Sequence, residues 1–334
     1  MFRLPFAEVQ RTLEGVLVKH GLTAERAAKC TRLFCETTED GVYTHGLNRF
    51  PRLVKMIQNG SVSATAVPER VAGFGALERW DGHQGVGNLN AWEAMERALE
   101  LSRWHGIGCV AMGNTNHWMR GGTYAWQAAD AGAIGICWTN TMVNLPPWGA
   151  TNAAIGNNPM AMGVPRKAGH VVLDIAMSQY SFGAIEAYRK RGEELPVIGG
   201  FDEEGKLTRD AAAIETTMRA LPIGFWKGSG LSILLDMTAA VLSLGRATWE
   251  IPTGSLTETR LSQLFFAINP ATLGPVERCE EIADAIVASV HAATPEKAGR
   301  TVRYPGEQTL KVRAENKKLG IPVDEDTWAE ILAM

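Results

Sequence analysis

The chain has 334 residues, enough for a large core, and its 46% hydrophobic and 21% charged residues are typical of globular proteins. A net charge of −3 without a long basic run argues against a nucleic-acid partner. No stretch reaches the ~20 apolar residues that span a bilayer, and the five cysteines are scattered without a Cys-x-x-Cys motif. We therefore expect a cytoplasmic protein with reduced thiols and no membrane partner.

The first 70 or so residues have the apolar spacing of helices. The first predicted helix ends at Gly21, and the second follows the cap residue Thr23 and breaks at Gly41. The third has Pro51 in its first turn and ends at Gly60. The residues expected to face the core are Phe6, Val9, Leu13, Val16, Leu17, Ala27, Cys30, Phe34, Leu53, Val54 and Ile57.

The connection between the second and third predicted helices contains His45 and Arg49. A histidine can move a proton near neutral pH, and an arginine can hold a carboxylate through two parallel hydrogen bonds. Interconversion of a 2-keto acid and a 2-hydroxy acid needs both functions. A helical turn would place the two side chains on one face, but Pro51 biases Phe50 towards extended geometry. On spacing alone, a surface or capping pair is the more common interpretation.

From about residue 70, strands and helices alternate, which predicts an α/β region. In chain order we predict a helix at 91–103, a strand at 107–112, a helix at 124–131 and a strand at 134–138. A buried strand at 171–175, an apolar helix at 229–244, a strand at 264–269 and an amphipathic helix at 277–293 follow. The tail from Pro305 predicts a helix to about Lys318, stopped by Gly320, and a short helix near Thr327.

Three glycine-rich segments could be turns or ligand loops. Segment 81–88 lacks the ordered G-x-G-x-x-G fingerprint and the acidic residue that should follow it, which favours a tight turn. Segment 199–205 is acidic but lacks the spacing of a calcium loop, so we expect a solvated turn. Segment 224–230 lacks the phosphate-loop pattern, yet Trp226 and Lys227 could contact a ligand. For this segment, structural turn and ligand loop stay equally open.

Two further segments hold candidate binding residues. In 114–122, between a strand and a helix, His117 and Arg120 could bind an oxygen-rich ligand, although a buried structural histidine is the simpler interpretation. At 305–308 the start of a helix offers free N–H groups to a phosphate, while Glu307 could instead complement the helix dipole. No H-E-x-x-H motif or His/Cys cluster predicts a metal, and no G-x-S-x-G motif predicts a serine hydrolase.

Taken together, these segments resemble the malate/L-lactate dehydrogenase family of non-Rossmann NAD(P)-dependent oxidoreductases over essentially the whole chain. The stretches that carry the resemblance are 41–52, 116–122, 135–140, 146–149, 195–202 and 224–230. The resemblance implies an α/β fold with a mixed-sheet nucleotide-binding domain at 73–295. It also implies a helical domain built from 1–72 and 296–334, and a homodimer.

The resemblance also implies roles for individual residues. His45 takes the place of the proton donor, and Thr44, Arg49 and His117 fall where substrate contacts are expected. The residues expected against the cofactor are His170, Val171, Val172, Leu173, Asp174, Ile175, Ala176, Trp226, Lys227, Gly306, Glu307 and Gln308. No metal is implied.

The implied reaction is reduction of a sugar-derived 2-keto acid by NADH, with NADPH as the other candidate cofactor. Reduction should then weaken as the pH rises through the pKa of His45. An alternative is a member of the family that acts on malate, lactate, ureidoglycolate or a cyclic imino acid. A non-catalytic sensor of a sugar acid or nucleotide belongs to a different class, and the presence of both His45 and Arg49 argues against it.

Overall fold

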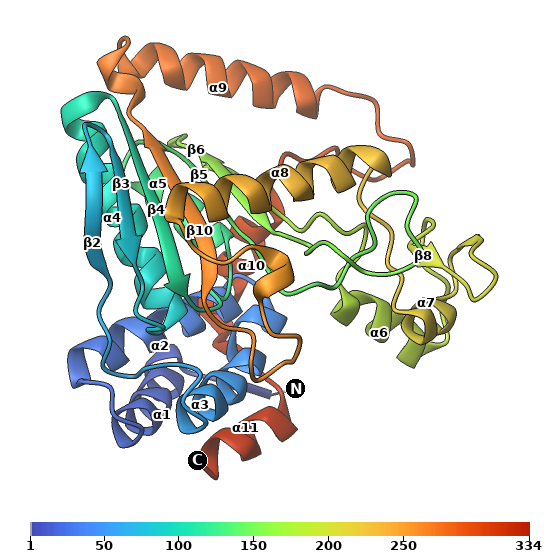
Figure 1. The fold of residues 1–334 in the computed structure, drawn as a ribbon. Coiled ribbons are helices and arrows are strands. Elements are labelled where there is room, and N and C mark those ends of the chain that lie inside the picture. Colours follow the sequence, from blue (N-terminus) through green and yellow to red (C-terminus); the bar gives the residue numbers. More distant parts are fainter. Residues whose placement is uncertain (1) are drawn as a thin grey trace.

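The computed structural model describes residues 2–334, and a mixed β-sheet forms its centre (Figure 1). Within these residues the sheet has seven strands in the order β2-β3-β4-β10-β5-β6-β7, of which β3 and β4 pair in parallel and the other neighbours antiparallel. The strands are β2 (Glu69–Phe74), β3 (Leu77–Asp81), β4 (Ile107–Thr115), β5 (Ile134–Thr139), β6 (Met160–Val164), β7 (Val171–Ile175) and β10 (Leu261–Ile268).

Helices cover both faces of this sheet. Along β4, Val110 and Met112 join the core under α4 (Gly87–His105) and α5 (Gly122–Asp130). The alternate residues Cys109 and Ala111 face α8 (Trp226–Ser243), because successive side chains of a strand point to opposite faces. Beyond α8 lies α9 (Val276–His291), which Figure 1 shows at the top of the molecule.

A helical layer below the sheet combines both ends of the chain (Figure 1). It contains α1 (Phe6–Lys19), α2 (Ala24–Glu39), α3 (Phe50–Gln58), α10 (Glu307–Leu319) and α11 (Glu325–Leu332). β1 (Phe2–Leu4) pairs antiparallel with β11 (Ile321–Val323), which ties the N-terminal segment to the C-terminal one. One buried cluster includes Val9, Leu13, Ile321 and Ile331, so the two ends share a hydrophobic core.

A smaller lobe projects from the sheet, on the right in Figure 1. It contains α6 (Phe182–Arg191), the hairpin of β8 (Gly200–Phe201) and β9 (Leu207–Thr208), and α7 (Ala211–Thr217). Its core includes Leu145, Ile185, Leu195 and Ile214. Short 3-10 helices connect other elements: η1 (Tyr43–His45), η2 (Leu47–Arg49), η3 (Thr248–Glu250) and η4 (Pro270–Thr272).

The predicted fold class is confirmed, because the mixed sheet lacks the parallel order of a Rossmann fold. The three N-terminal helices and the later helices and strands occur within a few residues of their predicted bounds, and Thr23 caps α2 through Arg26 N at 3.4 Å. Strands β1, β2, β3, β6 and β11 and helices α6 and α7 were not predicted. The domain division at 72/73 stays a prediction; β2, the first strand of the sheet, begins at Glu69.

Three local predictions were wrong. Phe50 is helical, with φ −60° and ψ −46°, although it precedes Pro51. Its buried ring packs edge-to-face on Phe34, with the ring centroids 5.4 Å apart, and this packing favours the helical conformation. Strand 171–175 is not buried throughout: it forms an edge of the sheet, and Leu173 is 41% exposed. Phe6 and Ile57, two of the predicted core residues, pack against the core but are only partly buried. Within residues 2–334, no helix combines the length and the apolar character needed to cross a membrane.

Candidate active site

A cleft of about 420 Å³ brings together three segments that are far apart in the sequence. The η1–η2 connection contributes Thr44, His45 and Arg49, and the segment after β4 contributes His117. The end of β7 contributes the third group of predicted residues, Asp174, Ile175 and Ala176. The proposed substrate residues therefore share one cleft with part of the proposed cofactor segment.

The loop that carries His45 is fixed against α2. Thr38 Oγ1 donates to Phe34 O at 2.9 Å and accepts from Leu47 N at 2.9 Å. Gly46 lies so close to α2 that a Cβ there would be 2.2 Å from Thr38 Oγ1, so a larger residue would displace the loop. Because His45 directly precedes Gly46, this contact sets where the imidazole enters the cleft.

The loop that carries His117 is also fixed. Asn116 Nδ2 donates to Gln84 O at 2.8 Å and to Gly85 O at 2.9 Å, and Thr259 Oγ1 donates to Asn116 Oδ1 at 2.6 Å. A Cβ at Gly87, the first residue of α4, would be 2.3 Å from His117 O. The predicted tight turn at 81–88 is confirmed, and its structural task is to let α4 approach this loop.

The two histidines lie against each other in the cleft. Their ring centroids are 5.9 Å apart at an interplanar angle of 18°. His45 Nδ1 is 3.0 Å from Thr44 Oγ1, and His117 Nδ1 accepts from Met119 N at 3.0 Å. Burial, reinforced by the positive charges of Arg49, Arg120 and Arg52, lowers the pKa of His45 to about 4. Burial likewise puts the pKa of His117 well below 6.5, so both rings are neutral in the free protein at pH 7.

Three arginines line the same cleft, and they differ in how they are paired. Arg52 donates to Glu258 at 3.2 Å, and Arg120 donates to Asp40 at 2.5 Å. The half-buried guanidinium of Arg49 has no hydrogen-bond or ion-pair partner within residues 2–334, and desolvation lowers its pKa to about 10. Glu258, whose charge acts on Arg49, is hydrogen-bonded to Arg52 instead. A partly desolvated guanidinium without a direct partner is costly for the folded protein, and an anionic ligand would compensate that cost.

The predicted cofactor segments are only partly adjacent. Asp174 accepts from Gly122 N at 2.8 Å, and burial raises the pKa of its carboxyl group. Val172 N donates to Pro305 O at 2.9 Å, and a Cβ on neighbouring Gly306 would be 3.1 Å from Val172 N. The start of α10 therefore lies directly beside β7. The positive φ of Gly306, +90°, permits this close approach, and the β7 strand continues from there to Asp174, Ile175 and Ala176 in the cleft.

Other predicted cofactor residues do not line the cleft. His170 pairs with Asp130 at 2.9 Å, Glu307 accepts from His291 Nε2 at 3.0 Å, and Gln308 pairs with Arg303. Trp226 and Lys227 lie at the start of α8, where the indole of Trp226 is 66% exposed. The remaining residues of the group, Val171 and Leu173, lie along the edge strand β7.

Several residues of the cleft were not predicted from the sequence: Arg52, Thr141, Asn144, Asn157, Phe182 and Glu258. The sequence could have indicated Arg52, because it lies three residues after Arg49 and α3 begins between them, so a helical turn places both on one face. The others come from distant loops without a local motif, so only the folded chain brings them together.

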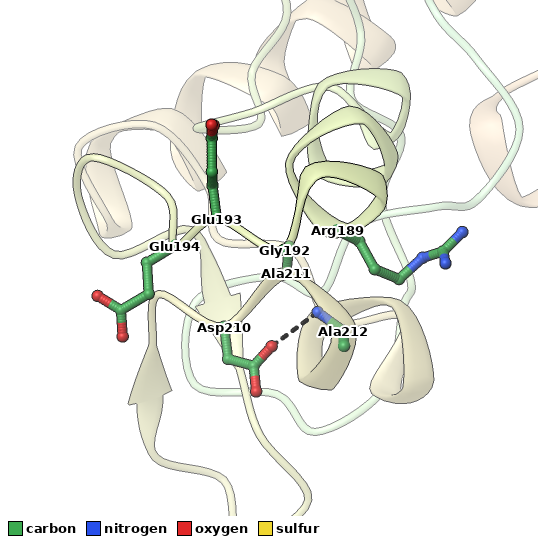
Figure 2. Close-up of a pocket in the computed structure, with 7 residues that line it drawn as sticks. All are labelled: Arg189, Gly192, Glu193, Glu194, Asp210, Ala211 and Ala212. Atoms are coloured by element: carbon green, nitrogen blue, oxygen red, sulfur yellow. Dashed lines mark hydrogen bonds between the residues drawn. The ribbon is translucent and has the colours of Figure 1, made fainter.

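Two other hollows have different chemistry. One, of about 250 Å³, lies between α6 and α7; Figure 2 shows Glu193 and Glu194 pointing apart and Asp210 capping α7 through Ala212 N at 2.8 Å. The other, of about 370 Å³, lies between α2, α5 and α10 and is lined mostly by charged side chains. Among residues 2–334 no group of three or more His, Cys, Asp or Glu side chains could hold a metal ion.

Comparison with known proteins gives matches over nearly the whole chain. The model of the family described as malate/L-lactate dehydrogenase matches residues 4–332. Proteins named 2,3-diketo-L-gulonate reductase from Escherichia coli K12 and Klebsiella pneumoniae 342 are each 43% identical, over 99% of this chain and 100% of theirs.

Solved structures give the same result. Sulfolactate dehydrogenase from Methanocaldococcus jannaschii has a TM-score of 0.92 at 26% identity, covering 99% of this chain and 95% of that one. Δ1-Piperideine-2-carboxylate reductase from Pseudomonas syringae has a TM-score of 0.87 at 25% identity, covering 100% and 99%.

Proposed function

The chain belongs to the malate/L-lactate dehydrogenase family and is an oxidoreductase that uses a nicotinamide cofactor, and from this premise we propose that it reduces a sugar-derived 2-keto acid with NADH. The proposed reaction is 2,3-diketo-L-gulonate to 3-keto-L-gulonate, the substrate in the name of the relatives that are 43% identical. His45 is the proposed proton donor.

The observation that carries this proposal is the half-buried, unpaired guanidinium of Arg49, four residues from His45 in one cleft. The Arg49 fork would hold the substrate carboxylate and so present one face of the C2 carbonyl. His45 would donate a proton to the C2 oxygen as negative charge develops there, and His117 would share that charge. Thr44, which is 3.0 Å from His45 Nδ1, would orient the imidazole.

The cofactor supplies the hydride when it is bound. We propose that Asp174, Ile175 and Ala176 hold its nicotinamide end, because these residues line the cleft with His45. Val172 and the neighbouring Gly306 would contact the parts of the dinucleotide farther from the cleft. NADH rather than NADPH is the proposed partner.

His45 must be protonated to act as the donor, whereas its pKa in the free protein is about 4. A substrate carboxylate on Arg49 offsets one of the charges that lower this pKa, so substrate binding should raise it. The pH profile of kcat/KM reports the pKa of His45 in the free enzyme, and that of kcat reports its pKa in the enzyme–substrate complex. We therefore expect kcat/KM for reduction to begin falling at a lower pH than kcat does. Oxidation should show the opposite trend. Equal break points in both profiles would contradict this coupling.

We also propose a homodimer, and the outer surface of α8 supports it. Apolar side chains there are unusually exposed, with Leu234 59%, Met237 56%, Val241 65% and Leu244 74% exposed to solvent. Such a surface is typical of an oligomer interface. Val241→Arg should shift the mass in analytical ultracentrifugation towards that of a monomer, while Val67→Arg, at a similarly exposed residue between α3 and β2, should not.

The test of the proposed function is loss of NADH absorbance with purified protein. The substrates are 2,3-diketo-L-gulonate, pyruvate, oxaloacetate and a cyclic imine, each repeated with NADPH. Turnover with the diketo acid and NADH supports the proposal. Turnover of another substrate alone would be consistent with the family but would assign a different substrate. NADH binding without any turnover would favour a sensor.

A further inference from the structure

Arg120 lies between β4 and α5 and lines the active-site cleft, although its side chain is only 5% exposed. Within residues 2–334 the one hydrogen bond of its side chain runs from Nη1 to Asp40 Oδ2. Its Nε is 3.8 Å from Asp174 Oδ2, too far for a hydrogen bond, and has no other partner among these residues. A guanidinium has five N–H donors, so Arg120 reaches the cleft with most of them unused.

Asp40 fixes Arg120 without neutralising it fully. Arg313, from α10, donates Nε to Asp40 Oδ1 at 2.6 Å and Nη2 to Asp40 Oδ2 at 2.8 Å. One buried carboxylate therefore serves two guanidinium groups, of which Arg313 occupies both oxygens and Arg120 only one. Asp174 adds a longer ion pair to Arg120, at 3.8 Å, but takes no hydrogen bond from its buried Nε. Arg120 is therefore the arginine that lines the active site with free N–H donors.

Arg120 and the other two arginines of the cleft come from different elements. Arg49 and Arg52 belong to η2 and α3, whereas Arg120 follows His117 by three residues in another segment. His117 stacks on His45, and the charge of Arg120 reaches His45 strongly enough to lower the pKa of that histidine. Each of the two segments that carry these histidines therefore also carries an arginine that lines the cleft.

We propose that Arg120 is a specificity-determining catalytic residue that donates a hydrogen bond to the C3 oxygen of a 2,3-dicarbonyl acid held by Arg49 and His45. This inference rests on the proposed function and assigns the reason for its substrate class. The C2 carbon gains the hydride and the C2 oxygen gains the proton of His45, while the C3 carbonyl is unchanged. Arg120 keeps its protons and stabilises the charge that develops beside the C3 carbonyl.

The proposal predicts discrimination at C3. A carbonyl oxygen at C3 accepts a hydrogen bond from the Arg120 guanidinium in the plane of the C3 carbonyl group. A hydroxyl group at C3 has its oxygen outside that plane and accepts the same hydrogen bond less well. Loss of a hydrogen bond to a charged group typically reduces a rate constant by about 10- to 100-fold. That loss should fall on the dicarbonyl substrate and spare its C3-hydroxy analogue.

The test compares Arg120→Met with Arg313→Met. Each variant leaves Asp40 paired with the remaining arginine. Arg120→Met also removes the 3.8 Å ion pair of Asp174, whose carboxylate is 30% exposed and keeps its hydrogen bond from Gly122 N. The two substrates are 2,3-diketo-L-gulonate and 2-keto-L-gulonate, which differ at C3; if the second is not reduced, its inhibition constant replaces kcat/KM. We expect Arg120→Met to reduce kcat/KM for the first by about 10- to 100-fold and to change the second by less than about threefold. Arg313→Met should leave the ratio unchanged.

A second readout is the pH profile. Removing the charge of Arg120 should move the pKa in kcat/KM upwards, whereas Arg313→Met should not move it. If Arg120→Met does not fold, Arg120→Lys keeps the charge and loses the fork, and should show a smaller loss in the same direction. Equal losses on both substrates with an unchanged pH profile would overturn the inference while leaving the proposed function intact. Failure of the wild-type protein to reduce the dicarbonyl acid would overturn both.

Discussion

The active-site cleft and the cavity between α2, α5 and α10 are similar in volume, about 420 and 370 Å³, but differ in how their charges are paired. The cavity is lined by Arg32, Arg120, Arg313 and Lys317 and by Glu36, Glu39, Asp40 and Asp130, four basic and four acidic side chains. The cleft has three arginines, and one of them has no partner within residues 2–334.

The difference separates a binding site from a structural network. Where each charged group has an ion-pair partner, as Asp40 has in Arg120 and Arg313, the ion pairs join α2, α10 and the segment before α5. Where a half-buried charge has no ion-pair partner, as at Arg49, the folded protein is prepared for a ligand of the opposite sign. Because Arg120 lines both hollows, it connects the two kinds of region.

The largest expected effect is on the chemistry in the cleft. His45→Asn should lower kcat by about 10²- to 10⁴-fold, because it removes the general acid. NADH affinity, measured by fluorescence titration, should change little. His105→Asn, at an exposed residue at the end of α4, is the control. Wild-type turnover and pH profile in His45→Asn would exclude this residue as the donor.

In the charged cavity, the largest effect should be on stability. Asp40→Asn removes the charge that accepts hydrogen bonds from both Arg120 and Arg313, leaves buried Arg120 only its longer ion pair with Asp174, and should lower the free energy of unfolding by about 3 kcal/mol. Glu36→Gln breaks a half-exposed pair with Arg32, 3.7 Å apart, and should cost less than about 0.5 kcal/mol. Urea unfolding measures the loss of unfolding free energy in each variant. Similar losses in the two variants would contradict the expected difference between the buried ion pairs of Asp40 and the half-exposed pair of Glu36.

A third effect distinguishes arginines of the two hollows by substrate binding. Arg49→Met should raise KM for the keto acid by about 10- to 100-fold, and Arg49→Lys by less, because lysine keeps the charge and loses the fork. Arg32→Met removes a cation that lines only the charged cavity and should leave KM unchanged. Steady-state kinetics at saturating NADH would show this. An equal rise in KM for Arg32→Met and Arg49→Met would point to general electrostatic attraction.

A fourth effect, which is absent at neutral pH, is on the pH dependence of stability. The folded-state pKa of His45, about 4, is below its ordinary value of 6.5, so the unfolded chain binds more protons between these values. The stability contributed by neutral His45 is therefore complete above pH 6.5 and decreases by about 1.4 kcal/mol per pH unit towards pH 4. His45→Asn should show a shallower slope in thermal melts over that range. A steeper slope in the variant would mean that folding raises the pKa of His45, not lowers it.

The sequence by itself determined much of the local structure. Periodic apolar residues such as Val9, Leu13 and Leu17 and the cap residue Thr23 predicted α1 and α2, because helix formation depends on contacts between near neighbours. Long recognisable stretches, above all 41–52, predicted the family and the non-Rossmann fold. The sequence also indicates His45, Arg49 and His117 as candidate site residues, and all three lie in one cleft.

Only the tertiary structure decided which charges are paired. Asp40 and Arg313 are 273 residues apart in the sequence, and Arg52 and Glu258 are 206 apart, so no local pattern could match them. The same is true of burial: strand 171–175 is apolar enough for a core, but sheet order makes it an edge strand. Phe50 is helical despite Pro51 because its ring packs on Phe34. Pairing and burial depend on neighbours distant in the chain, and folding alone determines those neighbours.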